Sequence, residues 1–326
     1  MKKVGIASIA ISFTLVFSAC GAPPPVTTPT PVSTPTIIPT STPLAVDATH
    51  PCIGAPAPAQ WHHIVVLMFE NKTYDQVIGP APYITGLANQ CATSSNWHDA
   101  NSKVDGSSDG KYKSKPNYAT LTNGLSPSVH GLVKDTYTTT TNVDNIYNQL
   151  NLSGLMFKDY YEAEAGGCGV RFGGDYHDPI RYYTNVASIC DAHDVPLSTF
   201  MADVNNGTLP AFSILLPDNQ HNMHNNSVSS GDAYARTILD PLLNSKAYAQ
   251  GDLAIFFLWD ENAPIPNVLL APSVVTGTKI TVPAGNPVSH FSALRTWEEM
   301  LGLPLLGDTE LAPSLLTYFG RIAPTQ

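Results

Sequence analysis

Acidic and amide side chains come in two adjacent pairs, and each pair directly follows an apolar run of the sequence. The pairs are Glu70 and Asn71, and Asp260 and Glu261. Either pair alone is typical of a solvated turn or a helix cap. Two adjacent acids behind an apolar run, however, repel each other unless a positive charge lies between them. Their oxygens suit a hard divalent cation, so together they predict one cation site, with Mg²⁺, Ca²⁺ or Mn²⁺ favoured and Zn²⁺ as the alternative.

The composition narrows the class of protein. The chain has 326 residues, of which 43% are apolar and 13% charged, and this predicts one sizeable globular domain with some non-globular sequence. Acidic residues outnumber basic ones by 26 to 16, which gives a formal charge of −10. No basic run could follow a phosphate backbone, and we therefore expect no nucleic-acid partner.

The first residues indicate export. Lys2 and Lys3 precede an apolar stretch, 4–17, and small residues then lead to Cys20. This pattern resembles a bacterial lipoprotein signal, with residues 1–19 as the signal peptide and Cys20 as the lipidated residue. A secretory signal cleaved nearby is the alternative. The expected location is extracytoplasmic, either on the cell membrane through the lipid anchor or secreted.

A Pro/Thr-rich segment without charged residues follows, and it cannot bury a core. We interpret residues 20–46 as the lipidated Cys and a tether, and residues 47–326 as one domain, because no second linker or internal repeat occurs there.

Apolar runs alternate with segments of helical spacing in this domain. The runs predict buried parallel strands at 63–69, 212–216 and 253–259, and the spacing predicts helices at 143–151, 232–244 and 291–301. This alternation is typical of an α/β sheet, whose ligands bind at the carboxyl ends of the strands. The polar residues after each run are therefore the candidates for a site.

Three further motifs join the two acidic pairs in a fixed order. They are Ser114-Lys115-Pro116-Asn117, Asp218-Asn219-Gln220-His221-Asn222-Met223-His224-Asn225 and Ser289-His290. In this order they resemble the phosphoesterase family of bacterial acid phosphatases and non-haemolytic phospholipases C, within the alkaline-phosphatase-like superfamily. The resemblance covers residues 60–305 and is strongest to the small secreted acid phosphatases. It implies an α/β fold with a central, mostly parallel sheet flanked by helices.

The resemblance also implies roles for single residues. Ser114 would be the nucleophile and Asn117 a phosphate-binding group, with Pro116 holding a turn that directs the Asn117 amide towards the phosphate. The family's phosphate-pocket histidines match His177, His224 and His290, and its metal ligands match the two acidic pairs. A serine hydroxyl is a weak nucleophile until it is activated, which a cation can do, and a histidine can give the leaving alcohol its proton.

Some positions depart from the family pattern. Tyr112 and Tyr176 replace a His and a Lys, and Asn222 and Asn225 replace two Asp. The two lost carboxylates weaken the case for a second metal. The residues that could still hold one, or support the first, are Asp218, His221 and Asp232.

Four cysteines besides Cys20 lie in a chain that we expect to be exported. Four cysteines allow three pairings, and proximity in the sequence favours Cys52–Cys91 and Cys168–Cys190. The rival interpretation is a metal site formed by cysteines, but the sequence has no Cys-x-x-Cys pair to support it.

We therefore expect an exported metal-dependent acid phosphatase that forms a phosphoserine intermediate. Its partners would be small phosphate esters or phosphoinositide head groups. A phospholipase C-type phosphodiesterase and a non-catalytic surface lipoprotein are the two alternatives.

Overall fold

The computed structural model describes residues 45–163, 168, 176–281 and 285–321. The predicted signal peptide and almost all of the predicted tether lie outside these residues. Within the described part, no helix is both long and apolar enough to cross a membrane.

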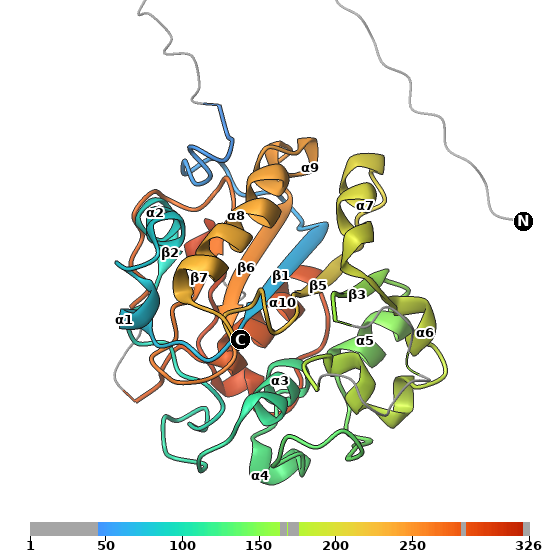
Figure 1. Ribbon diagram of the computed structural model, residues 1–326. Coiled ribbons are helices and arrows are strands. Elements are labelled where there is room, and N and C mark those ends of the chain that lie inside the picture. Colours follow the sequence, from blue (N-terminus) through green and yellow to red (C-terminus); the bar gives the residue numbers. More distant parts are fainter. Residues whose placement is uncertain (1–44, 164–167, 169–175, 282–284, 322–326) are drawn as a thin grey trace, which may run out of the picture. The chain divides into compact units, whose positions relative to one another are not determined.

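A seven-stranded sheet forms the centre of the domain, with the strand order β2-β7-β6-β1-β5-β3-β4 (Figure 1). The strands are β1 His63–Phe69, β2 Ala92–Thr93, β3 Phe157–Tyr161, β4 Asp194–Pro196, β5 Phe212–Leu216, β6 Leu253–Trp259 and β7 Val268–Leu270. The pairs from β6 to β4 are parallel, whereas β7 runs antiparallel to β6 and to β2. The predicted fold class, a mostly parallel sheet flanked by helices, is confirmed.

The three strands predicted from apolar runs have the predicted bounds, and they are the central β6, β1 and β5. Their side chains are buried along almost their whole length because helices cover both faces of the sheet. The α-helices are α1 Tyr74–Val77, α2 Pro82–Gln90, α3 Ser114–Asn123, α4 Pro127–His130, α5 Ile146–Leu152, α6 Cys190–His193, α7 Phe200–Asn206, α8 Val228–Leu243, α9 Lys246–Ala249 and α10 His290–Leu301. Short 3₁₀ helices lie at Pro179–Tyr182, Thr184–Val186, Leu197–Thr199, Thr309–Leu311 and Leu316–Phe319.

The helices form two layers. In Figure 1, α8 lies in front of the central strands and α10 behind them. Helix α2 packs against α8, and α3 packs against α10. Helix α10 begins with a reciprocal capping box between Ser289 and Ser292 and ends at Gly302 in the left-handed conformation. This arrangement gives α3 a fixed support, and α3 is the helix that begins at Ser114.

Both disulfides favoured by the sequence are present, Cys52–Cys91 and Cys168–Cys190. The first joins the chain before β1 to the end of α2. The second joins the described residue 168 to the start of α6. Cysteine pairs of this kind persist in an oxidising compartment, which agrees with the expected extracytoplasmic location.

The C-terminal end of α3 approaches another backbone segment closely. Gly124 has φ 70°, and a Cβ there would collide with the Leu306 carbonyl oxygen. The Gly124 carbonyl accepts a hydrogen bond of 2.7 Å from Asp308 N. Only glycine fits this position without displacing the 306–309 loop.

Gly124→Ala should therefore destabilise the protein by more than the cost of a left-handed backbone alone. Gly131 ends α4 with φ 79°, and a Cβ at this position would meet no atom within 4 Å, so it is a matched control. We expect Gly131→Ala to cost about 1–2 kcal/mol from the left-handed backbone, and Gly124→Ala about 1–3 kcal/mol more from the clash. Urea unfolding of both variants measures the difference, and equal losses would contradict the close approach.

Candidate active site

The two acidic pairs meet at the carboxyl end of the central strands. Strands β1 and β6 are parallel, and Phe69 is in register with Trp259. Glu70 and Asp260 are therefore neighbours, each one residue beyond its strand. Asp260 N donates to the Phe69 carbonyl at 3.2 Å, and Asn71 N donates to Asp260 Oδ1 at 3.1 Å. Asn71 makes this contact with φ 59°, in the left-handed region that Asn tolerates better than most residues.

These carboxylates are buried and crowded. Glu70 and Asp260 are fully buried and Glu261 is 4% exposed. Burial raises the pKa of Glu70 well above its usual range, and the charge of Asp260 raises it further. Burial and then the Asp260 charge raise the pKa of Glu261 to about 8. In the absence of a cation, the protein would hold some of these groups protonated.

Two of the buried carboxylate oxygens, Asp260 Oδ2 and Glu261 Oε2, make no hydrogen bond within the described part of the chain. Leaving a buried anionic oxygen without a partner is costly, and a divalent cation is a partner of the right charge and hardness. Lys72, two residues after Glu70, instead donates its Nζ to the Met223 carbonyl at 2.7 Å. The unpaired oxygens of Asp260 and Glu261 are therefore suited to bind a metal ion.

Ser114 and Tyr118 contact both oxygens of Glu70 from one helix. The Ser114 hydroxyl donates to Glu70 Oε2 at 3.0 Å, and the Tyr118 hydroxyl donates to Oε1 at 2.6 Å. The two residues are four positions apart, so they lie on the same face of α3. Ser114 is the first residue of this ten-residue helix, where the backbone dipole favours an anion.

His177 and His224 approach Glu70 from two other segments. His177 Nε2 lies 3.5 Å from Glu70 Oε1, and the centroids of the two imidazole rings are 5.5 Å apart. His224 Nδ1 is 2.7 Å from Asn225 Oδ1. An amide oxygen only accepts, so this contact places the proton on Nδ1 and leaves Nε2 free to bind or transfer a proton. Glu70, His177 and His224 form a group that could also hold a metal ion.

His290 is in a different environment from the other two histidines. It is fully buried, and its Nε2 is 2.6 Å from the backbone carbonyl of Asp260, to which it must donate. Burial lowers its pKa, so the neutral form is favoured. A neutral His290 would not attract a phosphate dianion as a cation would, so this environment does not favour the phosphate-pocket role that the family resemblance implies for it. Its hydrogen bond instead orients the residue that carries the Asp260 carboxylate.

Asn117 is engaged with the backbone. Its Oδ1 accepts from Ala100 N at 2.7 Å, and its Nδ2 donates to the Lys113 carbonyl at 2.8 Å. The expected turn at Pro116, which would direct this amide towards the phosphate, does not exist, because Pro116 is the third residue of α3. The side chain of Asn117 fixes the start of α3 beside the 99–101 segment.

A second group that could hold a metal consists of Glu162, Asp218 and His221. His221 Nδ1 lies 3.1 Å from Glu162 Oε2 and 3.0 Å from Asp218 Oδ1. The predicted Asp218 and His221 thus come together, but with Glu162 in place of Asp232. Both carboxylate oxygens of Asp232 accept from the backbone at the start of α2, from Tyr83 N and Ile84 N.

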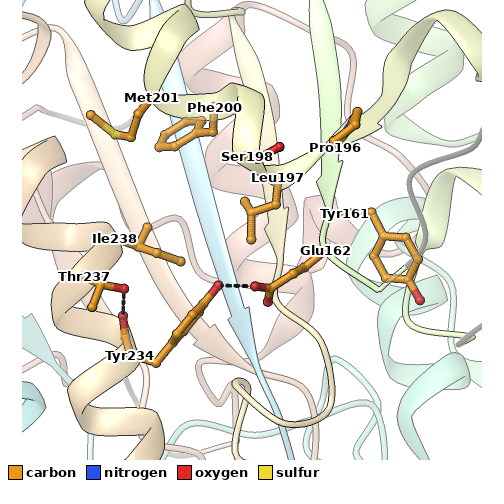
Figure 2. Close-up of a pocket in the computed structure, with 10 residues that line it drawn as sticks. All are labelled: Tyr161, Glu162, Pro196, Leu197, Ser198, Phe200, Met201, Tyr234, Thr237 and Ile238. Atoms are coloured by element: carbon orange, nitrogen blue, oxygen red, sulfur yellow. Dashed lines mark hydrogen bonds between the residues drawn. The ribbon is translucent and has the colours of Figure 1, made fainter.

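Glu162, one residue of this second group, lines a cleft of about 370 Å³ (Figure 2). The Tyr234 hydroxyl donates to Glu162 Oε1 at 2.8 Å, the dashed line at the centre of the figure. Asp218 N and His221 contact the other oxygen of Glu162. Contacts within the protein therefore occupy both oxygens of Glu162, whereas Asp260 Oδ2 and Glu261 Oε2 have no hydrogen-bond partner among the described residues.

Comparison with known proteins agrees with this geometry. Residues 108–265 match the Phosphoesterase family. The chain contains a Phosphoesterase family domain. The matched range includes Ser114, His177, His224, Asp260 and Glu261. The proposed ligands Glu70 and Asn71 precede it.

Two relatives support the same class of enzyme. The chain is 27% identical to the phosphatidylinositol-3-phosphatase of Mycobacterium tuberculosis over 82% of this chain and 86% of that protein. It is 25% identical to a probable acid phosphatase of Kluyveromyces lactis over 76% of this chain and 60% of that protein. The protein is therefore a phosphoric ester hydrolase.

Solved structures confirm the fold of this phosphoesterase. A protein of the alkaline phosphatase superfamily from Vibrio parahaemolyticus aligns with a TM-score of 0.53 and 13% identity, over 85% of this chain and 74% of that one. The lipoteichoic acid synthase LtaP from Listeria monocytogenes aligns with a TM-score of 0.55 and 12% identity, over 83% and 77% of the two chains.

Sequence reasoning missed two residues of the phosphoesterase site region. Tyr118 holds Glu70, and the available signal was its spacing of four from Ser114, which becomes informative once α3 is known to begin at Ser114. Glu162 follows β3, a strand that the apolar runs did not predict.

Asn117→Asp tests the structural role of this amide. The new carboxylate would lose the donor to the Lys113 carbonyl and place two acceptors against each other. We expect a loss of about 1–3 kcal/mol in the free energy of unfolding, measured by urea denaturation. Unchanged stability together with a raised KM for a phosphate ester would instead show that Asn117 binds phosphate.

Proposed function

We propose that the protein is an exported metal-dependent acid phosphatase, which hydrolyses phosphomonoesters through a phosphoserine intermediate. The observation that carries this proposal is the Ser114 hydroxyl at a helix N-terminus, 3.0 Å from a buried carboxylate that two histidines also approach. Glu70, Asn71, Asp260 and Glu261 are the proposed metal ligands. A bound divalent cation would polarise the serine hydroxyl and offset the negative charge of the phosphoryl group.

The residues of this chain provide a balanced route for the protons. Ser114 Oγ attacks phosphorus, and its proton passes to Glu70 Oε2, which already accepts its hydrogen bond. His224, protonated at the start, gives its Nε2 proton to the leaving alcohol as the ester bond breaks. Water then attacks the phosphoserine and loses a proton to His224. Glu70 returns its proton to Ser114 Oγ, and inorganic phosphate leaves.

His177 is proposed to orient Glu70 and His224, the two residues that transfer these protons. The centroid of its ring is 5.6 Å from that of Tyr118 and 5.5 Å from that of His224, and its Nε2 lies 3.5 Å from Glu70 Oε1. Protonated imidazoles would also attract a phosphate dianion, and this attraction favours activity at acidic pH. His290 is given no cationic role in this proposal, because its buried imidazole is hydrogen-bonded to the Asp260 carbonyl.

A comparison of ester substrates, with and without chelator, tests the proposed function. We expect p-nitrophenyl phosphate to be hydrolysed faster than bis(p-nitrophenyl) phosphate, and exhaustive chelation to abolish both activities. Asp260→Asn should weaken cation binding, measured by metal titration, because it removes one of the crowded charges. A faster diester reaction would transfer the assignment to a phospholipase C-type enzyme, and full activity after chelation would refute the metal requirement.

Ser114→Ala tests the nucleophile. We expect a rate loss of roughly 10³-fold or more, about 4 kcal/mol in barrier, because the covalent step is removed. Thr122→Val is the matched control, since it removes another buried hydroxyl of α3 that bonds to the Tyr118 carbonyl rather than to Glu70. Acid quenching of the wild type should trap phosphate on the peptide containing Ser114. Retention of more than about a tenth of the rate by Ser114→Ala would rule out this mechanism.

Export through a lipoprotein signal is part of the proposal, with Cys20 as the acylated residue. The supporting observations are the basic and apolar start of the sequence and the two disulfides. Cys20→Ala should release the protein into the medium or leave it unprocessed, as measured by fractionation and by the mass of the mature chain. Normal processing with unchanged membrane association would count against acylation at Cys20.

A further inference from the structure

Basic residues are concentrated beside the proposed nucleophile. Four lysines fall within residues 103–115, although the whole chain has a net charge of −10. Two of them have clear partners. Lys115 is buried and donates its Nζ to the Thr136 and Thr139 carbonyls, and Lys103 lies 3.8 Å from Asp109.

The other two, Lys111 and Lys113, are exposed and form no ion pair with any described residue within 4.0 Å. Both line a pocket of about 590 Å³, which Glu261, Asn262 and Ala263 also line. Lys113 is also the residue immediately before Ser114. The pocket thus adjoins the site where the phosphoryl group would be transferred.

Hydrogen bonds within the protein hold the walls of this pocket. Asp99 is 1% exposed, and its two oxygens accept from Asn101 N and Ala263 N, both at 3.0 Å. Asn101 Oδ1 accepts from Tyr112 N. One buried carboxylate and one amide therefore connect the lysine-bearing segment to the loop after β6. The pocket is preformed rather than a gap between loose loops.

The chemistry of the lining indicates what the pocket can bind. Between the lysines and Glu261 the wall is polar, with His98, Asn101, Ser102 and Ser108. Such a surface suits hydroxyl groups better than acyl chains. The two exposed lysines add positive charge that a neutral alcohol would not use, whereas a second phosphate would pair with both.

We propose that this pocket binds the alcohol part of the substrate, and that Lys111 and Lys113 select polyhydroxy alcohols carrying a second phosphate. This inference rests on the proposed phosphomonoesterase function and adds its substrate class. The phosphate to be removed lies at Ser114, and the second phosphate lies between the two lysines. The repulsion from Glu261 is offset when that carboxylate contributes to the metal site.

The test compares kcat/KM for fructose 1,6-bisphosphate and fructose 6-phosphate, with p-nitrophenyl phosphate as the reference substrate. We expect the wild type to prefer the bisphosphate by at least tenfold, and Lys111→Gln/Lys113→Gln to reduce that preference to about twofold or less. The reference activity of the double variant should remain within about twofold of wild type. Lys246→Gln is the control for overall charge, because Lys246 is exposed on α9, which precedes β6 at the opposite end of the strand.

Each outcome decides the proposal. A wild type without preference for the bisphosphate, or a double variant that keeps the preference, would overturn the inference while leaving the phosphatase assignment intact. An equal loss of preference in Lys246→Gln would also overturn it, because the effect would then be one of overall charge. A wild type inactive on p-nitrophenyl phosphate and both sugar phosphates would refute the proposed function, and the inference with it.

Discussion

The site depends on the placing of negative charge inside the protein. Parallel pairing of β1 with β6 puts Glu70 and Asp260 side by side, each one residue past a buried strand, and Glu261 follows. Crowded, buried carboxylates oppose folding unless they are protonated or paired with positive charge. The residues that the structure describes offer hydrogen bonds to only some of their oxygens. A cation would bind the remaining oxygens. The stability of the fold and the proposed chemistry therefore both require a positive charge among these carboxylates.

The other parts of the site are arranged around this charge. Helix α3 presents Ser114 and Tyr118 to Glu70, and its support by α10 and by the close contact at Gly124 fixes where the hydroxyl lies. The loops after β3 and β5 bring His177 and His224 to the same carboxylate. His224 is oriented by Asn225, an amide at a position where the family pattern has Asp. A neutral acceptor fixes the same tautomer without adding a further negative charge.

The sequence was sufficient to predict the strands that are buried on both faces. Strands β1, β5 and β6 are continuous apolar runs, and their bounds were predicted correctly because both of their faces are covered. Strand β3 was missed since it contains Lys158 and Asp159, whose partners come from distant segments: Lys158 Nζ donates to Asp203, and the Tyr147 hydroxyl donates to Asp159 Oδ2. The bonding of Asn117 likewise depends on Ala100, a partner that no local pattern reveals. Residue types indicated the chemistry, whereas contacts between distant segments determined which atoms are free to perform it.

The central claim is that a cation binds among Glu70, Asp260 and Glu261 rather than at Glu162, Asp218 and His221. Crystals soaked in Mn²⁺ and measured at the manganese absorption edge test it directly, because anomalous scattering locates the metal independently of activity. We predict one strong peak within coordination distance of the Glu70 and Asp260 carboxylates. A peak only at the Glu162 group, or no peak at millimolar Mn²⁺, would contradict the account.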